Sequence, residues 1–135
     1  MCSGAGSCCA LARTGAPSSA ESASTASSGA QPSASRRSPF GGTIAHGNYT
    51  LSLGPRFSYA MFGLDGFAFA LNCGFDRVRL PAPLPVGSRV RMRAVLSDIS
   101  DIAGGVQIAV TQTFEREGTD KPVCVAEMLT RAYTG

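Results

Sequence analysis

The chain has 135 residues, which is room for one domain, and its 12 basic side chains nearly balance its 9 acidic ones. Three arginines against Glu21 give residues 1–42 a charge of +2, and the remainder carries +1, so neither part resembles a nucleic-acid-binding protein. No apolar run reaches the roughly 20 residues that span a membrane. The five cysteines are odd in number and form no Cys-x-x-Cys pair, which argues against a disulfide framework or a metal site. We expect a cytoplasmic protein.

Residues 1–38 consist mostly of Ser, Ala, Gly and Arg. Such a composition buries too little apolar surface to offset its conformational entropy, and it predicts disorder. Three explanations stay open: a true disordered tail, an organellar transit peptide, or a replacement of the domain's normal start by a shifted reading frame or a misassigned start. The folded domain is therefore expected over residues 39–135.

Apolar residues from Ile44 to Phe62 recur at helical spacing, and Gly63 is expected to end this helix. Gly54-Pro55 interrupts the pattern. Because proline lacks a backbone donor and clashes with the preceding turn, we expect a kink or a break there.

After Gly63 the apolar period changes to two, which indicates strands. The first runs from about Phe67 to Leu80 and has one crowded apolar face, whose Phe67, Phe69 and Phe75 are expected in the core or in a dimer interface. Three more strands follow, over residues 89–96, 106–117 and 123–133. The sequence therefore predicts an α+β domain in which four antiparallel strands cover one helix.

Three stretches resemble the MaoC-like dehydratase family of (R)-specific enoyl-CoA hydratases: Pro39-Phe-Gly-Gly-Thr-Ile-Ala-His-Gly47, residues 76–91, and Lys121-Pro-Val-Cys-Val-Ala-Glu127. Their order and spacing agree with that family as well. The resemblance implies a hot-dog fold, a long central helix wrapped by an antiparallel sheet. It also implies that the family's first strand, and the short helix after it, are lacking or replaced here, which favours an altered start.

The resemblance implies an activity, the reversible addition of water to a trans-2-enoyl thioester of coenzyme A, with no further cofactor. In the family the glycine of the His-Gly pair, here Gly47, offers its backbone N–H to the thioester oxygen, where negative charge develops. The histidine of this pair, His46, chiefly shapes the helix start, and a direct acid–base role for it is the less favoured alternative.

The family's catalytic aspartate and histidine do not carry over, because residues 29–37 contain neither and His46 is the sole histidine. We therefore expect weak or absent hydration. The alternatives are a non-catalytic subunit that binds acyl-CoA or pairs with an intact hot-dog partner, and an unstable remnant. Homodimers are usual for hot-dog proteins, so a homodimer is expected too.

Asn72 and the arginines Arg77 and Arg79 are the candidate substrate-binding residues. Asn72 falls among small residues on the sparser face of its strand, where it would line an acyl pocket or make an ordinary strand hydrogen bond. The two arginines, with Arg89, Arg91 and Arg93, are expected on neighbouring strands as one basic stripe. Such a stripe suits coenzyme A phosphates, although a solvated outer face is the simpler explanation for any single arginine.

Overall fold

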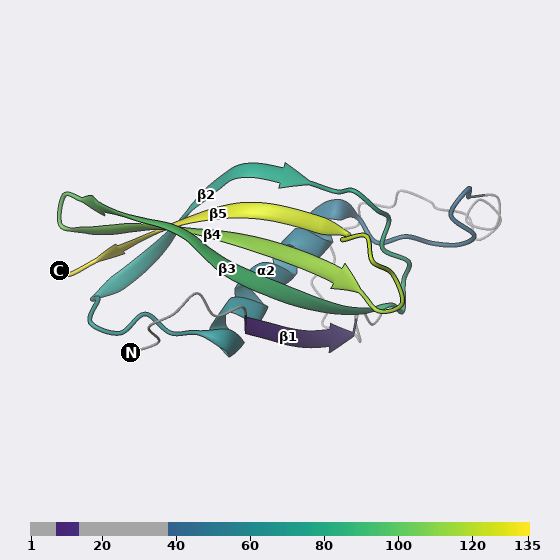
Figure 1. Cartoon of the computed structure of the whole chain (residues 1–135), viewed down its shortest axis with the longest axis horizontal. Helices are drawn as coiled ribbons and strands as arrows, with labels where there is room; N and C mark the ends of the chain where they lie inside the picture. Colours follow the sequence, from purple (N-terminus) through teal and green to yellow (C-terminus); the bar gives the residue numbers. More distant parts are fainter. Residues whose placement is uncertain (1–7, 14–37) are drawn as a thin grey trace, which may run out of the picture.

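The computed structural model describes residues 8–13 and 38–135 of the chain. One helix lies behind one antiparallel sheet (Figure 1). The elements, in chain order, are β1 (Cys8–Arg13), α2 (Gly47–Met61), β2 (Phe69–Arg79), β3 (Arg89–Ile102), β4 (Gly105–Arg116) and β5 (Cys124–Tyr133). Within the described residues, the predicted helix and the four strands after it are confirmed, with the strand at residues 89–96 extended to Ile102.

The sheet has the order β1-β3-β4-β5-β2, with all neighbours antiparallel. The expectation that the domain lacks a first strand is wrong, because Cys8–Arg13 pairs with residues 89–94 of β3. Without this strand, the backbone donors and acceptors at the edge of β3 would be unpaired. The backbone of Cys8–Arg13 pairs with them, and the sequence from Cys8 to Ala12 is an uninterrupted apolar run. Residues 1–7 and 14–37 lie outside the described part of the chain, and so does the predicted disorder there.

Helix α2 begins and ends within three residues of the predicted bounds and runs through Pro55 without a break. Of the kink or break predicted at this proline, the break does not occur. Thr50, Gly54, Phe57 and Ser58 are buried, so packing on the sheet continues on both sides of the proline and outweighs the hydrogen bond that it removes. Within the described residues, no helix has the length and the hydropathy that crossing a bilayer requires.

The core lies between α2 and the facing side of the sheet. Alternate residues of β3, Val90, Met92 and Ala94, are buried, and their arginine neighbours are exposed, as the alternating pattern predicts. Phe114 of β4 is fully buried and meets Phe57 of α2 edge to face, with 6.3 Å between the ring centres.

Strand β2 is arranged differently from the prediction of a crowded apolar core face. Phe69 and Leu71 are both 52% exposed, whereas Phe67 and Phe75 pack partly buried against the core. The strand shifts register twice, between Asn72 and Gly74 and between Phe75 and Arg77, so side chains change faces along its length. The smaller residues Ala70 and Asn72 are the ones that face the helix.

Candidate functional site at the two ends of the helix

At the N-terminus of α2, one backbone donor has no acceptor in the described part of the chain. His46 is the N-cap residue, and its Nδ1 accepts a hydrogen bond from the backbone N–H of Asn48 at 3.2 Å. Its carbonyl oxygen accepts from Tyr49 at 2.9 Å and from Thr50 at 3.4 Å. The N–H of Gly47 has no acceptor among the described residues. A helix N-terminus with a free donor attracts a negatively charged or polarised oxygen.

A pocket of about 280 Å³ opens beside this donor. All three stretches that carry the family resemblance contribute to it, although they are far apart in the sequence. We call it the Gly47 pocket, and its lining residues are Phe40, Ile44, Ala45, Gly47, Thr50, Leu80, Pro81, Ala82, Pro83, Leu84 and Val123.

Two backbone hydrogen bonds hold the pocket together. The N–H of Ala45 donates to the carbonyl of Leu84 at 2.7 Å, and the N–H of Val86 donates to the carbonyl of Thr43 at 3.0 Å. The segment before the helix thus pairs with the proline-rich segment after β2, and Leu84 is buried beneath them. This pairing places the side chain of Leu80 against Gly47.

A side chain at position 47 would require the side chain of Leu80 to move. A Cβ atom built on Gly47 would collide with the Cδ1 atom of Leu80. Because glycine has no side chain, it allows a ligand to approach the backbone closely at this position.

No side chain that lines the Gly47 pocket, among the residues described, is ionisable. His46 directly precedes Gly47 at the start of α2. Its Nδ1 caps the helix by accepting a hydrogen bond from the backbone N–H of Asn48. The stretch 29–37, where the sequence lacks the expected Asp/His pair, lies outside the described residues. The described residues also contain no group of three or more His, Cys, Asp or Glu side chains that would hold a metal ion.

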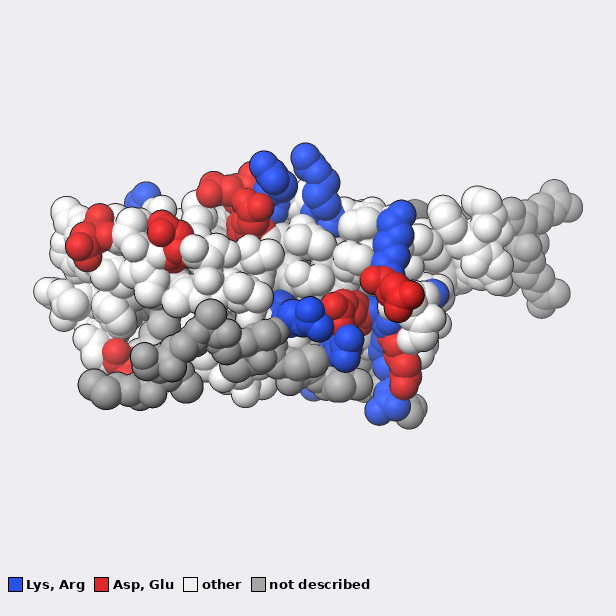
Figure 2. All heavy atoms as spheres, in the orientation of Figure 1, with Lys and Arg blue, Asp and Glu red and all other residues white. Residues whose placement is uncertain are grey.

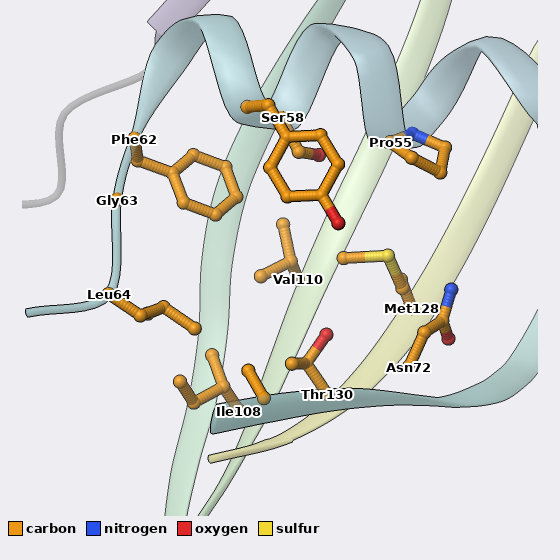
Figure 3. A pocket seen from close by; sticks show the side chains of 12 residues that line it. Pro55, Ser58, Phe62, Gly63, Leu64, Asn72, Ile108, Val110, Met128 and Thr130 are labelled. Carbon is orange, nitrogen blue, oxygen red and sulfur yellow. The ribbon is translucent and has the colours of Figure 1, made fainter. Parts of the chain in front are cut away.

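A second pocket, of about 230 Å³, lies at the other end of α2 (Figure 3). We call it the Asn72 pocket, and it is mostly apolar. Its lining residues are Pro55, Ser58, Tyr59, Phe62, Gly63, Leu64, Ala70, Asn72, Ile108, Val110, Met128 and Thr130. Asn72 therefore lines a pocket beside the helix, and its Oδ1 also accepts a strand hydrogen bond from the N–H of Gly74 at 3.0 Å.

A buried amide lies between the helix and the sheet next to this pocket. Gln112 of β4 is fully buried, and its Nε2 donates to Ser58 Oγ at 3.2 Å and to Met128 Sδ at 3.4 Å. Its Oε1 atom has no partner among the described residues and faces Gly54, where a Cβ would come within 2.8 Å. The sequence carried an overlooked signal for this residue, because Gln112 occupies a core-facing position in the alternation of Ile108, Val110 and Phe114.

The predicted single basic stripe does not exist. Arg77 and Arg79 lie on β2 at one edge of the sheet, and strands β4 and β5 separate them from the arginines of β3. The expectation of neighbouring strands was wrong because the proline-rich connection crosses to the far side of the sheet rather than forming a hairpin.

Most of these arginines lie beside acids (Figure 2). Arg91 and Arg93 both pair with Glu115, Arg89 lies 3.7 Å from Glu117, and Arg77 lies 3.8 Å from Glu127. Arg79 makes no ion pair within the described residues and donates to the carbonyl of Val78 at 3.3 Å. It directly precedes Leu80, so it is the candidate arginine nearest to the Gly47 pocket in the chain.

A helix whose free N-terminal amide opens on a pocket, wrapped by an antiparallel sheet, defines a hot-dog protein. The structure resembles that of a MaoC-like dehydratase from Rhodospirillum rubrum, with a TM-score of 0.63 and 17% identity over 76% of this chain and 70% of the other. A family model described as "MaoC like domain" matches residues 30–117, so the chain belongs to the MaoC-like dehydratase family.

Two curated relatives agree with this assignment. The chain is 50% identical over 94 residues to 3-hydroxyacyl-thioester dehydratase Z of Mycobacterium tuberculosis, a match that covers 69% of this chain and 62% of the relative. It is 40% identical over 95 residues to nodulation protein N of Rhizobium leguminosarum bv. viciae, covering 69% of this chain and 59% of that relative. The chain thus spans about three fifths of the length of these relatives.

Proposed function

We propose that this chain binds an acyl thioester of coenzyme A in the Gly47 pocket and catalyses the reversible hydration of trans-2-enoyl-CoA only weakly. The observation that carries the proposal is the N–H of Gly47, which has no acceptor among the described residues and which the helix dipole reinforces. This donor would stabilise the charge that develops on the thioester oxygen when water adds. The reaction needs no further cofactor, since coenzyme A enters as part of the substrate.

The acyl chain is proposed to follow α2 from the Gly47 pocket to the Asn72 pocket. Gly47 lines the first, and Pro55, Ser58 and Phe62 line the second, at spacings that keep one face of the helix. The 11 residues from Gly47 to Ser58 correspond to about 16 Å of helix at 1.5 Å per residue. An extended acyl chain suits such a path along an apolar helix face.

Arg79 is the proposed contact for the phosphates of coenzyme A. It is exposed, it makes no ion pair among the described residues, and it lies next to the residue that covers Gly47. Arg77 is less suited because Glu127 partly neutralises it, although an exposed pair at 3.8 Å holds it only weakly.

A second candidate function is that of a binding partner for an intact hot-dog subunit. The absence of an ionisable side chain around the Gly47 pocket, in the part of the chain that is described, favours it. Strand β2 is one of the two outer strands of the described sheet and exposes Phe69 and Leu71, which suits pairing with a second subunit. The same edge would serve a homodimer. In either role we place the protein in the cytoplasm and in fatty-acid metabolism.

Two measurements on the full chain separate these functions. Calorimetry with decanoyl-CoA tests binding, and the loss of absorbance of crotonyl-CoA on hydration tests turnover. Binding with slow hydration supports the first function. Binding without hydration until an intact family member is added, with a larger complex in sedimentation, supports the second. If the folded chain binds no acyl-CoA, both are wrong.

A further inference from the structure

The polar side chains of the Asn72 pocket share one chemical property, since those that reach it have hydrogen-bond donors to spare. Ser58 and the largely exposed Tyr59 come from α2, Asn72 from β2 and Thr130 from β5. In Figure 3 the amide nitrogen of Asn72 and the hydroxyl of Thr130 point from the sheet towards the helix. The rest of the lining is predominantly apolar, so these groups meet a ligand with little competition from other polar atoms.

For Asn72, the acceptor atom is already occupied. Its Oδ1 accepts from the N–H of Gly74, and this backbone donor fixes the orientation of the amide. The NH₂ group is left without an acceptor among the described residues, so Asn72 offers the pocket donors only.

For Ser58, the acceptor oxygen is likewise occupied, in this case by the amide of Gln112. Nε2 of Gln112 donates to Ser58 Oγ and to Met128 Sδ, so the oxygen of Ser58 is the acceptor in this contact. The hydroxyl proton of Ser58 is then available for donation. The hydroxyl of Thr130 has no hydrogen-bond partner among the described residues, so it can donate as well.

We infer, on the basis of the proposed function, that the acyl chain of the preferred substrate carries an oxygen acceptor, an ether, keto or hydroxyl oxygen, at the position that reaches Ser58, Asn72 and Thr130. A purely hydrocarbon chain would leave these donors desolvated and unpaired, which disfavours its binding. An oxygen at the matching position pairs with them while the rest of the chain contacts the apolar wall.

The test compares decanoyl-CoA with analogues in which an ether oxygen replaces one methylene at a time from mid-chain to the tip. Calorimetry on the full chain measures each dissociation constant. We expect one oxygen position to bind about tenfold more tightly than decanoyl-CoA, the gain of roughly one well-placed hydrogen bond.

Two variants remove donors with little change of shape. Thr130→Val removes a hydroxyl, and Asn72→Asp keeps the acceptor for Gly74 but loses the NH₂ group. Both are expected to bring the affinity ratio of the ether to the hydrocarbon ligand close to one. Thr113→Val, a matched change on the opposite face of β4, should keep the tenfold ratio.

The outcomes separate failure of the proposed preference for an oxygen in the acyl chain from failure of acyl-CoA binding itself. If decanoyl-CoA binds but no ether analogue binds more tightly, the inference is overturned and the proposed function stands. If the affinity ratio of the ether analogue to decanoyl-CoA stays near tenfold in both donor-removing variants, other residues bind the oxygen. The inference is then equally wrong. If neither ligand binds, the proposed function itself fails.

Discussion

The two ends of α2 differ in how they present chemistry to a ligand. At the N-terminal end, the hydrogen-bond donor that faces the pocket is the backbone N–H of Gly47. The side chains around it are mostly apolar. At the C-terminal end the useful groups are side-chain donors on three separate elements. A backbone donor tolerates changes in the surrounding side chains, whereas side-chain donors change with a single substitution. The first end therefore suits chemistry common to a family, and the second suits the choice of substrate.

Gly47→Ala is expected to have the largest effect, because it hinders access to the backbone donor. The new methyl group collides with Leu80 and hinders close approach of the thioester to the backbone, and loss of one oxyanion donor typically costs about a hundredfold in rate. The hydration rate of crotonyl-CoA measures it.

A control and a double variant separate access from folding. Gly42→Ala adds a methyl group that meets nothing within 4 Å and should leave the rate unchanged. Gly47→Ala combined with Leu80→Ala relieves the collision. If the double variant recovers full activity, steric strain and not hindered access to the donor explains the loss.

The reactivity of two cysteine thiols reports on the packing near the two pockets. Cys124 follows Val123 of the Gly47 pocket, and Cys73 follows Asn72 of the other pocket. Burial raises the pKa of the Cys124 thiol to about 11, while Cys73, next to Asn72, is exposed. Because the thiolate is the reactive form, Cys124 should alkylate about a hundredfold more slowly than Cys73 at neutral pH. Peptide mass spectrometry after timed iodoacetamide treatment resolves the two sites. Equal rates would mean that the start of β5 is open.

The stability of the fold should depend on pH for the same reason. Burial favours the neutral thiol of Cys124 in the folded state, so the unfolded state ionises first as the pH rises. The stabilisation of the folded state by the neutral Cys124 thiol is complete below the ordinary thiol pKa of about 8.5. It is lost as the pH rises towards 11. Cys124→Ser should flatten this part of the profile of unfolding free energy. An unchanged slope would contradict the assignment.

Ala70→Leu fills the Asn72 pocket and tests whether the acyl chain reaches it. The larger side chain takes up space that methylenes would occupy, so the ratio of decanoyl-CoA to butyryl-CoA affinity should fall about tenfold. Ala109→Leu, on the other face of β4, is the matched control and should keep the ratio. A constant ratio in both variants would place the chain elsewhere.

His46→Ala should have the smallest effect. It removes the side chain that caps the N–H of Asn48, and loss of an N-cap costs about 1 kcal/mol of unfolding free energy. His46→Asn, which keeps a capping acceptor, should restore most of this stability in urea titrations. If His46→Asn abolishes hydration while it preserves stability, the imidazole takes part in the chemistry after all.

Much of this fold is visible in local sequence patterns. The helical period before Gly63 and the period of two after it predicted α2 and four strands, because each element buries one face against the same core. The Phe-Gly-Gly-Thr-Ile-Ala-His-Gly stretch located the helix start and singled out Gly47. In contrast, the helix-breaking propensity of Pro55 was a poor guide, since packing of Gly54 and Ser58 on the sheet outweighs it.

The sequence by itself determined the family, the position of the helix and the candidate donor Gly47, because each rests on motifs whose residues lie close together within one stretch of the chain. Only the tertiary structure decided the rest. Strand order separated Arg77 and Arg79 from the arginines of β3, and the two register shifts set which side chains of β2 face α2. The convergence of Leu80 on Gly47, and of Ser58, Asn72 and Thr130 on one pocket, depends on pairing between distant segments, which no local pattern encodes.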